Sequence, residues 1–220
     1  FDWLCIDMEH SSIELKDILP LIISIENNGM VPLVRVGENN PNLIKRVMDA
    51  GAYGVIVPNI NNALDAKAAV NAVKYPPNGT RGVGLYRAQG YGKIFEQYLQ
   101  WLEEESVVII QIEHIDAVRN IDEILSVPGI DAFIIGPYDL SGSMDKPGKF
   151  DDEEVQKAVD LVLQAGKKYN IPAGFHSVSS DPQNALKYKN KGFKFLGFSL
   201  DSIFLGDMVI EAMDVLRKTS

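Results

Sequence analysis

Two apolar segments of this 220-residue chain each end in an acidic side chain, Glu113 after residues 107–112 and Asp139 after residues 132–138. Nearly continuous runs of Val and Ile are typical of strands buried on both faces of a parallel sheet, and such sheets build their sites at the carboxyl ends of the strands. Two acids there could bind one hard divalent cation, such as Mg²⁺ or Mn²⁺. For either acid alone, a bond to a helix N-terminus or a lysine has equal weight.

Arg35 places a charge inside the apolar segment 32–36. A buried guanidinium without an anionic partner costs several kcal/mol, so we expect such a partner. A carboxylate of the protein would serve, and so would the carboxylate or enolate oxygen of a substrate, for which the planar fork of arginine is suited. The sequence leaves both alternatives open.

His10 directly follows an acid, and acids beside an imidazole raise its basicity, which suits a general base. A lone histidine is more often structural, so the spacing alone is weak. Asp49 lies near the end of a predicted helix and becomes interesting only if folding brings it to His10. His114 and His176 carry weaker signals, and we expect neither to bind a metal.

The elements that must position these side chains alternate along the chain. Segments with helical periodicity separate most of the strand-like segments, which is the pattern of βα units on a parallel sheet. In a barrel all carboxyl ends meet on one face, so the polar residues after the strands should gather there. The seven strand-like segments are 3–6, 31–36, 54–58, 107–112, 132–135, 171–175 and 193–198, and the further polar residues at their ends are Asp7, Glu9, Asn59, Gln111, Ser199 and Asp201.

Helix signals fill the intervals. Ser12 could cap a helix over 12–28 that Pro20 should kink or split, and Pro41 opens a second helix that Gly51 closes. The remaining helices are predicted at 62–75, 151–169, 181–191 and 203–216. A long segment rich in glycine, proline and aromatic residues, 76–92, is expected to be a functional loop.

The fold class follows from this alternation. A G-x-G-x-x-G segment between a strand and a helix is missing, which removes the main support for dinucleotide binding in a doubly wound sheet. We therefore predict an α/β protein with a single (β/α)8 TIM barrel over residues 1–220, in which the first strand precedes Phe1. This predicted barrel is N-terminally truncated.

Composition excludes several classes of function. The formal net charge is -9, and without a block of Lys and Arg the chain is not expected to bind nucleic acid. Cys5 is the single cysteine, so an intrachain disulfide is excluded, and it is expected to be a small buried side chain. No apolar segment approaches the ~20 residues that cross a bilayer, so no membrane partner is expected.

Taken together, several motifs resemble the HpcH/HpaI aldolase family, the class II metal-dependent pyruvate aldolases. The motifs are FDWLCIDMEH at 1–10, Val34-Arg35, RGVG at 81–84, QIE at 111–113 and GPYDLS at 136–141. The resemblance runs along essentially the whole chain in the right order. It implies a TIM barrel of the phosphoenolpyruvate/pyruvate-domain type that begins upstream of residue 1.

The resemblance also implies a reaction, the reversible cleavage of a 4-hydroxy-2-oxo acid to pyruvate and an aldehyde. The ion would be Mg²⁺, Mn²⁺ or Co²⁺, and a loop at 85–92 would surround the aldehyde. Arg81 and Arg87 could steer an anionic substrate, although loop arginines are more often solvated. By the match, Glu113 and Asp139 bind the metal, Arg35 contacts pyruvate, His10 and Asp49 form a catalytic pair, and Gln111, Pro137, Tyr138 and Asp139 line the pyruvate pocket.

The family further implies a homo-oligomer, trimer or hexamer, with the apolar helix 203–216 at a subunit interface, and a cytoplasmic location. Packing of that helix on its own barrel is the alternative. Other outcomes of the same enolate chemistry are oxaloacetate decarboxylation and citrate-lyase-like acyl-CoA cleavage. A homologue that binds a keto acid without turning it over is the non-enzymatic alternative.

Overall fold

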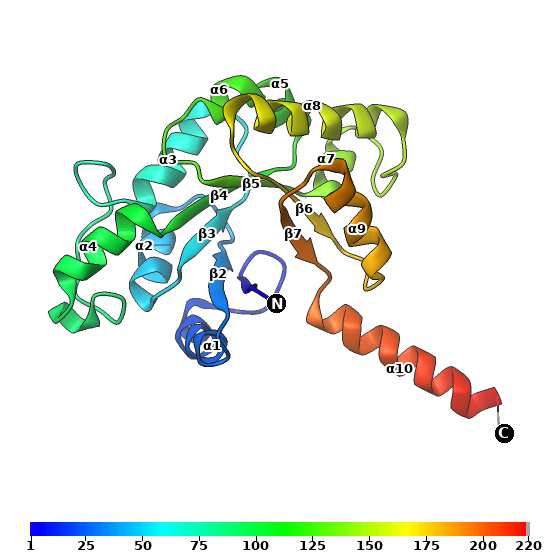
Figure 1. Cartoon of the computed structure of the whole chain (residues 1–220), viewed down its shortest axis with the longest axis horizontal. Helices are drawn as coiled ribbons and strands as arrows, with labels where there is room; N and C mark the ends of the chain where they lie inside the picture. The colour runs from blue at the N-terminus through cyan, green and yellow to red at the C-terminus, as the bar shows by residue number, and fades with distance from the viewer. Residues whose placement is uncertain (219–220) are drawn as a thin grey trace.

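The computed structural model describes residues 1–218, and in this range seven parallel strands form one sheet in the order of the chain. The sheet curls into a half-barrel with most of the helices on its outer side (Figure 1). This confirms the seven predicted strands, although the sixth begins after Pro172, whose ring nitrogen cannot donate to the ladder. The strands are β1 Trp3–Asp7, β2 Val31–Arg35, β3 Gly54–Val57, β4 Val107–Ile112, β5 Ala132–Ile135, β6 Ala173–Ser177 and β7 Phe195–Phe198.

Helices connect the strands, and the residues at the helix ends can be compared with the predicted ones. Helix α2 begins at Pro41, and Gly51 ends it in the left-handed region, both as predicted. The side chain of Asn40 caps this helix. The predicted start at Ser12 is wrong, because Glu14 forms a capping box with Asp17 and α1 begins one residue after Glu14. Pro20 does not split α1. The helices are α1 Leu15–Asn27, α2 Pro41–Ala50, α3 Ala63–Val73, η1 Gly90–Gly92, α4 Phe95–Glu104, α5 Ile115–Arg119, α6 Ile121–Leu125, α7 Pro137–Ser143, α8 Glu153–Tyr169, α9 Pro182–Lys191 and α10 Asp201–Lys218.

The apolar core has two parts. The larger part lies between the sheet and the helices, and a smaller inner cluster fills the concave side of the sheet. On the concave side the rings of Trp3 in β1 and Phe195 in β7 stack with their centroids 4.6 Å apart, so side chains bridge the two edge strands. Cys5 packs in the inner cluster, and burial raises the pKa of its thiol to about 12, which leaves it a small apolar side chain.

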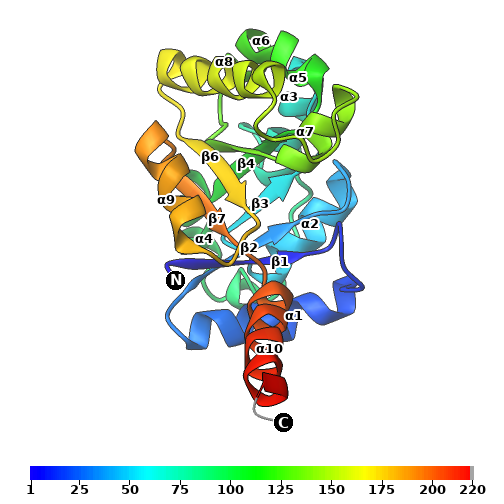
Figure 2. The same cartoon turned by 90° about the vertical axis from the view of Figure 1, so that its right-hand side faces the viewer.

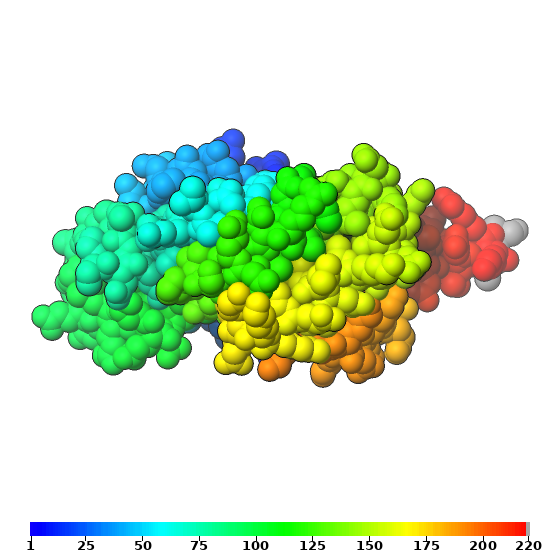
Figure 3. Space-filling view, turned by 90° about the horizontal axis from the view of Figure 1, so that it is seen from above, coloured from blue at the N-terminus to red at the C-terminus, as the bar shows by residue number. Residues whose placement is uncertain are grey.

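Helix α10 extends away from the barrel. It projects from the body of the chain in two perpendicular views (Figure 2), and from above it forms a separate arm (Figure 3). None of its residues is buried, so packing on its own barrel, the alternative considered above, is not what the structure shows. The predicted helix 203–216 lies inside α10, and the last two residues of the predicted domain lie outside the described part. Across residues 1–218 no helix has the length and apolar character that a membrane span requires.

Gly54 of β3 has no room for a side chain against β4. A Cβ there would overlap the carbonyl group and side chain of Val107, its partner in the ladder. We expect Gly54→Ala to lower the free energy of unfolding by about 1–3 kcal/mol, as overpacking does. In the control Gly142→Ala the added Cβ meets no atom within 4 Å. Urea unfolding of both variants measures the difference, and equal stabilities would contradict this account of the sheet.

Candidate active site

The carboxyl ends of the strands bring the first group of polar side chains together. Asp7 and Arg35 close β1 and β2 and are paired in the register of the sheet. Gln111 and Glu113 come from the end of β4, and Asp139 lies in the first turn of α7, directly after β5. Parallel strands place all of these positions at one end of the half-barrel.

Arg35 is held by carboxylates of the protein. Its Nε donates to Asp7 Oδ1 at 2.9 Å, its Nη2 donates to Asp7 Oδ2 at 2.6 Å, and its Nη1 lies 3.3 Å from Glu9 Oε2. Although burial raises the pKa of Asp7, the bonds to Arg35 outweigh it and the pKa is lowered. Asp7 therefore supplies the protein partner that was one alternative for Arg35, and it uses only two of the five N–H groups.

Glu113 is buried with both carboxylate oxygens held. The backbone N–H of Asn59 donates to Oε1 at 2.7 Å, and the side-chain amide of Gln111 donates to Oε2. Asn59 takes a left-handed conformation, with φ 57°, directly beyond β3. Gly136 leaves the necessary room, because a Cβ there would lie 3.1 Å from the Cβ and Oε2 of Glu113. Gln111, predicted to bind substrate, binds Glu113 in this structure.

The electrostatics of this end suit a divalent cation. Burial raises the pKa of Glu113, the charge of Asp139 adds to the rise, and the hydrogen bonds from Gln111 and Asn59 oppose it. Burial also raises the pKa of Glu9, and the charge of Glu113 adds to that rise. Arg35 is the nearby positive side chain that opposes both shifts. Buried Glu113 and exposed Asp139 thus fit the donor set of a hard ion.

The other residues predicted for the pyruvate pocket lie at the same end. Pro137 is buried at the start of α7, whereas Tyr138 is 53% exposed and packs edge-on against Phe150.

The two remaining histidines make contacts within the protein. His114 caps α5, and its Nδ1 accepts the N–H of Asp116. The ring of His176 lies 3.4 Å from the carbonyl oxygen of Ser199, and burial lowers its pKa.

His10 and Asp49 are not brought together within one chain. His10 is exposed beyond β1, with its Nε2 3.9 Å from Glu9 Oε2. Helix α2 returns from the carboxyl to the amino ends of the strands, so Asp49, in its last turn, lies at the opposite end of the sheet. There its carboxylate binds Arg81 at 2.5 Å and Gln89 at 3.1 Å.

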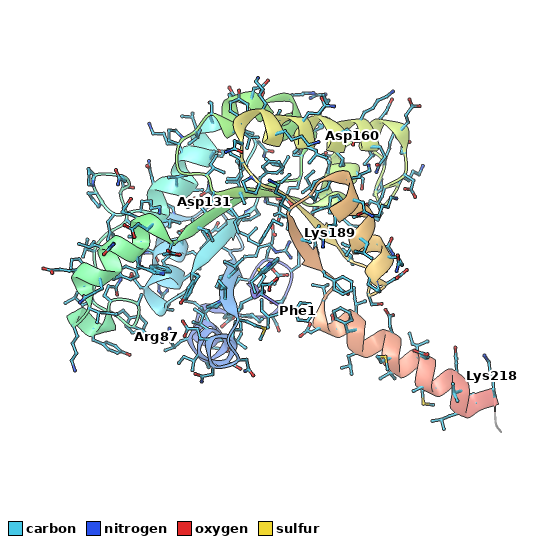
Figure 4. The ribbon with its side chains drawn as sticks, viewed as in Figure 1. Phe1, Arg87, Asp131, Asp160, Lys189 and Lys218 are labelled. Atoms are coloured by element: carbon cyan, nitrogen blue, oxygen red, sulfur yellow. The ribbon has the colours of Figure 1, made fainter. Side chains whose placement is uncertain are left out.

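The loop between α3 and α4 also lies at the amino ends, because it follows a helix rather than a strand. Its backbone bonds to Asp49, and Arg87 binds Glu26 of α1 and the carbonyl oxygen of Ala50. Arg87 is labelled in Figure 4, beside α1. Within one chain this loop lies at the opposite end of the sheet from Glu113, so its place around the aldehyde stays a prediction. Arg81 is buried, so it does not steer a substrate.

The sequence analysis named three residues of this site without assigning what they contact. Asp7, Glu9 and Asn59 were expected near the strand ends, but their partners were not assigned. A signal for Asp7 existed, because Trp3, Cys5 and Asp7 alternate in one strand and would share its inner face. The backbone bond from Asn59 leaves no mark in the side-chain pattern.

Comparison with known proteins gives the family. The family model for HpcH/HpaI aldolase/citrate lyase matches residues 1–205. This chain belongs to that family. The predicted resemblance is therefore confirmed, and the enzyme is an aldolase, a carbon-carbon lyase of the class II, metal-dependent type.

Relatives and solved structures agree with this assignment. The chain is 37% identical to the 2-dehydro-3,6-dideoxy-6-sulfogluconate aldolase of Pseudomonas putida over 99% of this chain and 84% of that protein. It is 36% identical to the 2-keto-3-deoxy-L-rhamnonate aldolase of Klebsiella pneumoniae over 92% of this chain and 76% of the relative. An HpcH/HpaI aldolase/citrate lyase family protein from Burkholderia cenocepacia superposes with a TM-score of 0.93 at 32% identity, over 99% and 86% of the two chains.

The buried charge of Glu113 predicts a pH-dependent stability for this aldolase. A carboxyl group with a raised pKa binds more protons when folded, so the metal-free protein should lose stability as the pH rises above the ordinary pKa of glutamate. Glu113→Gln removes this loss, and we expect a higher unfolding temperature than wild type at pH 7, with the difference vanishing near pH 4. Calorimetry of the metal-free proteins measures it.

Addition of Mg²⁺ or Mn²⁺ should reverse that order. An ion bound only by the folded wild type stabilises it by about 2.7 kcal/mol at 100 times the dissociation constant. Glu113→Gln should gain little, since one of the two proposed ligands is lost. An equal gain in both proteins would place the ion elsewhere.

Proposed function

We propose that this aldolase cleaves a 4-hydroxy-2-oxo acid to pyruvate and an aldehyde, with Glu113 and Asp139 holding a divalent ion. The observation that carries the proposal is the gathering of two carboxylates and one oriented guanidinium at the carboxyl ends of the strands. The relatives named above supply the substrate class, the 2-keto-3-deoxy acids of their names. Mg²⁺, Mn²⁺ and Co²⁺ are the ions to test.

The bond changes define what the side chains must do. A base removes the proton of the 4-hydroxyl, the electrons of the C3–C4 bond move into a C2–C3 enolate, and C4 leaves as the aldehyde. Protonation at C3 then gives pyruvate. The bound ion would supply positive charge beside the enolate oxygen. Arg35 supplies a second positive group, and Asp7 fixes its orientation before the charge develops.

The predicted substrate contacts keep their places in this proposal. The first N–H groups of α7, at Tyr138 and Asp139, have no acceptor within the helix, which suits a substrate carboxylate. Gln111 orients Glu113, and its place in the pyruvate pocket stays a prediction. His10 is exposed at the same end and serves as the base.

Asp49 then supports His10 only across two copies of the chain. The two residues lie at opposite ends of one sheet, so the carboxylate of one copy must approach the imidazole of another. Such a contact is compatible with a two-fold pair, in which each copy contributes His10 to one site and Asp49 to the other, or with a closed ring. The trimer or hexamer stays a prediction. The uncovered α10 supports assembly, because it exposes Leu205, Met208, Val209, Ile210 and Met213.

We also propose that an eighth strand, preceding Phe1, completes the barrel between β1 and β7. Within the described residues these two strands are the edges of the sheet, and the rings of Trp3 and Phe195 stack between them. The barrel would then form a single domain. The cytoplasmic location stays a prediction.

The reaction is tested by pyruvate release from 4-hydroxy-2-oxo acids, coupled to lactate dehydrogenase. EDTA should abolish the release and an added divalent ion should restore it. Arg35→Ala and Glu113→Ala should each lose turnover while remaining folded by circular dichroism. Full activity in either variant would contradict the proposed site.

The alternatives give different products in related assays. Release of carbon dioxide from oxaloacetate alone would indicate a decarboxylase, and cleavage of an acyl-CoA would indicate a citrate-lyase-like enzyme. Binding of pyruvate without turnover of any hydroxy-oxo acid would indicate a non-catalytic homologue.

Subunit mixing tests whether the pair of His10 and Asp49 spans two copies. His10→Ala and Asp49→Asn chains, each inactive or nearly so, are unfolded together and refolded as mixed oligomers. Some sites then combine an intact His10 with the intact Asp49 of a neighbour, so turnover should return. If the pair forms within one chain, turnover should not return. A monomer in light scattering would also contradict a pair that spans two copies.

A further inference from the structure

Arg81 of the RGVG segment is the most completely enclosed charged side chain near Asp49. Its side chain is 0% exposed, and its Nη2 lies 2.5 Å from Asp49 Oδ1. Its Nη1 donates to the hydroxyl of Tyr98 at 2.9 Å, and the guanidinium lies 4.7 Å from the centre of the Tyr75 ring. These contacts fix the guanidinium from several sides, so it cannot turn toward a substrate.

Gln89 binds the same oxygen of Asp49. Its Nε2 donates to Asp49 Oδ1 at 3.1 Å and to the hydroxyl of Tyr75 at 2.9 Å. Its Oε1 accepts the backbone N–H of Tyr86 at 2.9 Å, and the side chain is fully buried. Two buried donors therefore converge on Oδ1.

The second oxygen, Oδ2, has no donor among the described residues. Gly84 faces it, since a Cβ at this position would lie 3.7 Å from Oδ2. Gly84 does not have a positive φ, so the backbone does not require glycine. The missing side chain instead leaves Oδ2 uncovered.

The partly buried pair of Arg35 and Asp7 shows a different geometry. Arg35 uses two nitrogens on both oxygens of Asp7, the bidentate arrangement that gains most from a carboxylate. Arg81 instead shares one oxygen with Gln89. This arrangement holds the carboxylate in place and reserves one oxygen for a further donor.

We propose that Arg81 and Gln89 form a carboxylate clamp that positions Asp49, with Gly84 as its opening, so that Oδ2 is presented to the His10 imidazole of a second copy. The inference rests on the proposed function and adds two positioning residues and an access position to it. It also explains the arginine and the second glycine of the RGVG segment.

The clamp is tested with Arg81→Lys, which keeps the charge but loses the fork. We expect kcat for pyruvate release to fall by about 10- to 100-fold, as for groups that orient an active-site side chain, with KM little changed. The matched control is Arg87→Lys on the same loop, which alters the pair with Glu26 and does not touch the carboxylate of Asp49. It should keep wild-type kcat.

A double variant separates positioning from general damage to the fold. In the Asp49→Asn background Arg81→Lys should lower kcat no further, because the group that it positions is gone. A full additional loss in that background would overturn the proposal. So would wild-type kcat in the folded Arg81→Lys protein.

The glycines give a second test that leaves the buried contacts intact. Gly84→Val should lower kcat by covering Oδ2, at an unchanged unfolding temperature. Gly82→Val is the control, because a Cβ there meets only Lys45 Cδ, at 3.9 Å, and it should keep wild-type kcat. Equal kcat values in the two variants would overturn the role of Gly84.

Failure of the clamp and failure of the proposed function remain distinguishable. A wild type that releases no pyruvate contradicts the function. Urea unfolding of the Asp49→Asn, Arg81→Lys and double variants then still measures the clamp, since coupled residues give non-additive changes in the free energy of unfolding. Additive changes would overturn it.

Discussion

One guanidinium among several carboxylates determines how the carboxyl end of this half-barrel is organised. Arg35 contacts Asp7 and Glu9 directly, and its charge also reaches Glu113. Burial raises the pKa values of Glu9 and Glu113, the charges of neighbouring acids add to the rise, and the one guanidinium does not cancel it. The folded chain thus keeps an unbalanced negative charge at the place where the strands end, and a divalent ion would relieve it.

The surrounding structure holds that charge in a fixed geometry. The ladder sets Asp7 opposite Arg35, the left-handed Asn59 aims its N–H at Glu113, and the absent side chain of Gly136 lets Glu113 lie across the end of β5. Each contact limits the movement of an acid that would otherwise turn toward water. Without its ion, the folded protein is therefore less stable than it would be with uncharged side chains at this place. Such a loss of stability is common in preorganised active sites.

At the opposite end of the sheet the two arginines each have one carboxylate partner, Asp49 for Arg81 and Glu26 for Arg87. There Arg81 and Gln89 enclose most of Asp49, and Arg87 ties the same loop to α1. The two ends are connected by α2, whose direction is fixed by the short connections of a parallel sheet. A residue early in α2 faces the active-site end, whereas one late in it, such as Asp49, faces the amino ends. His10 and Asp49 can therefore cooperate only if two copies of the chain bring them together.

The sequence by itself determined the number of strands, their parallel order and the identity of the acids at their ends. Val and Ile runs, the cap at Asn40 and the glycine at position 51 act over a few residues, so their effects are legible in one dimension. The same local logic failed at Ser12, where the capping box at Glu14 competes for the helix start. It gave no prediction for α4, α5, α6 or α7, of which the last three have seven residues or fewer.

Only the tertiary structure decided which groups meet. Asp7 is 28 positions from Arg35, Asn59 is 54 from Glu113, and Arg81 is 32 from Asp49. Such contacts join residues far apart in the chain, and they form only once the strands are paired and each helix has packed on the sheet. The sequence therefore named His10 and Asp49 as a pair by resemblance, and the fold separated them, because a helix that follows a parallel strand must carry its last turn to the other end of the sheet.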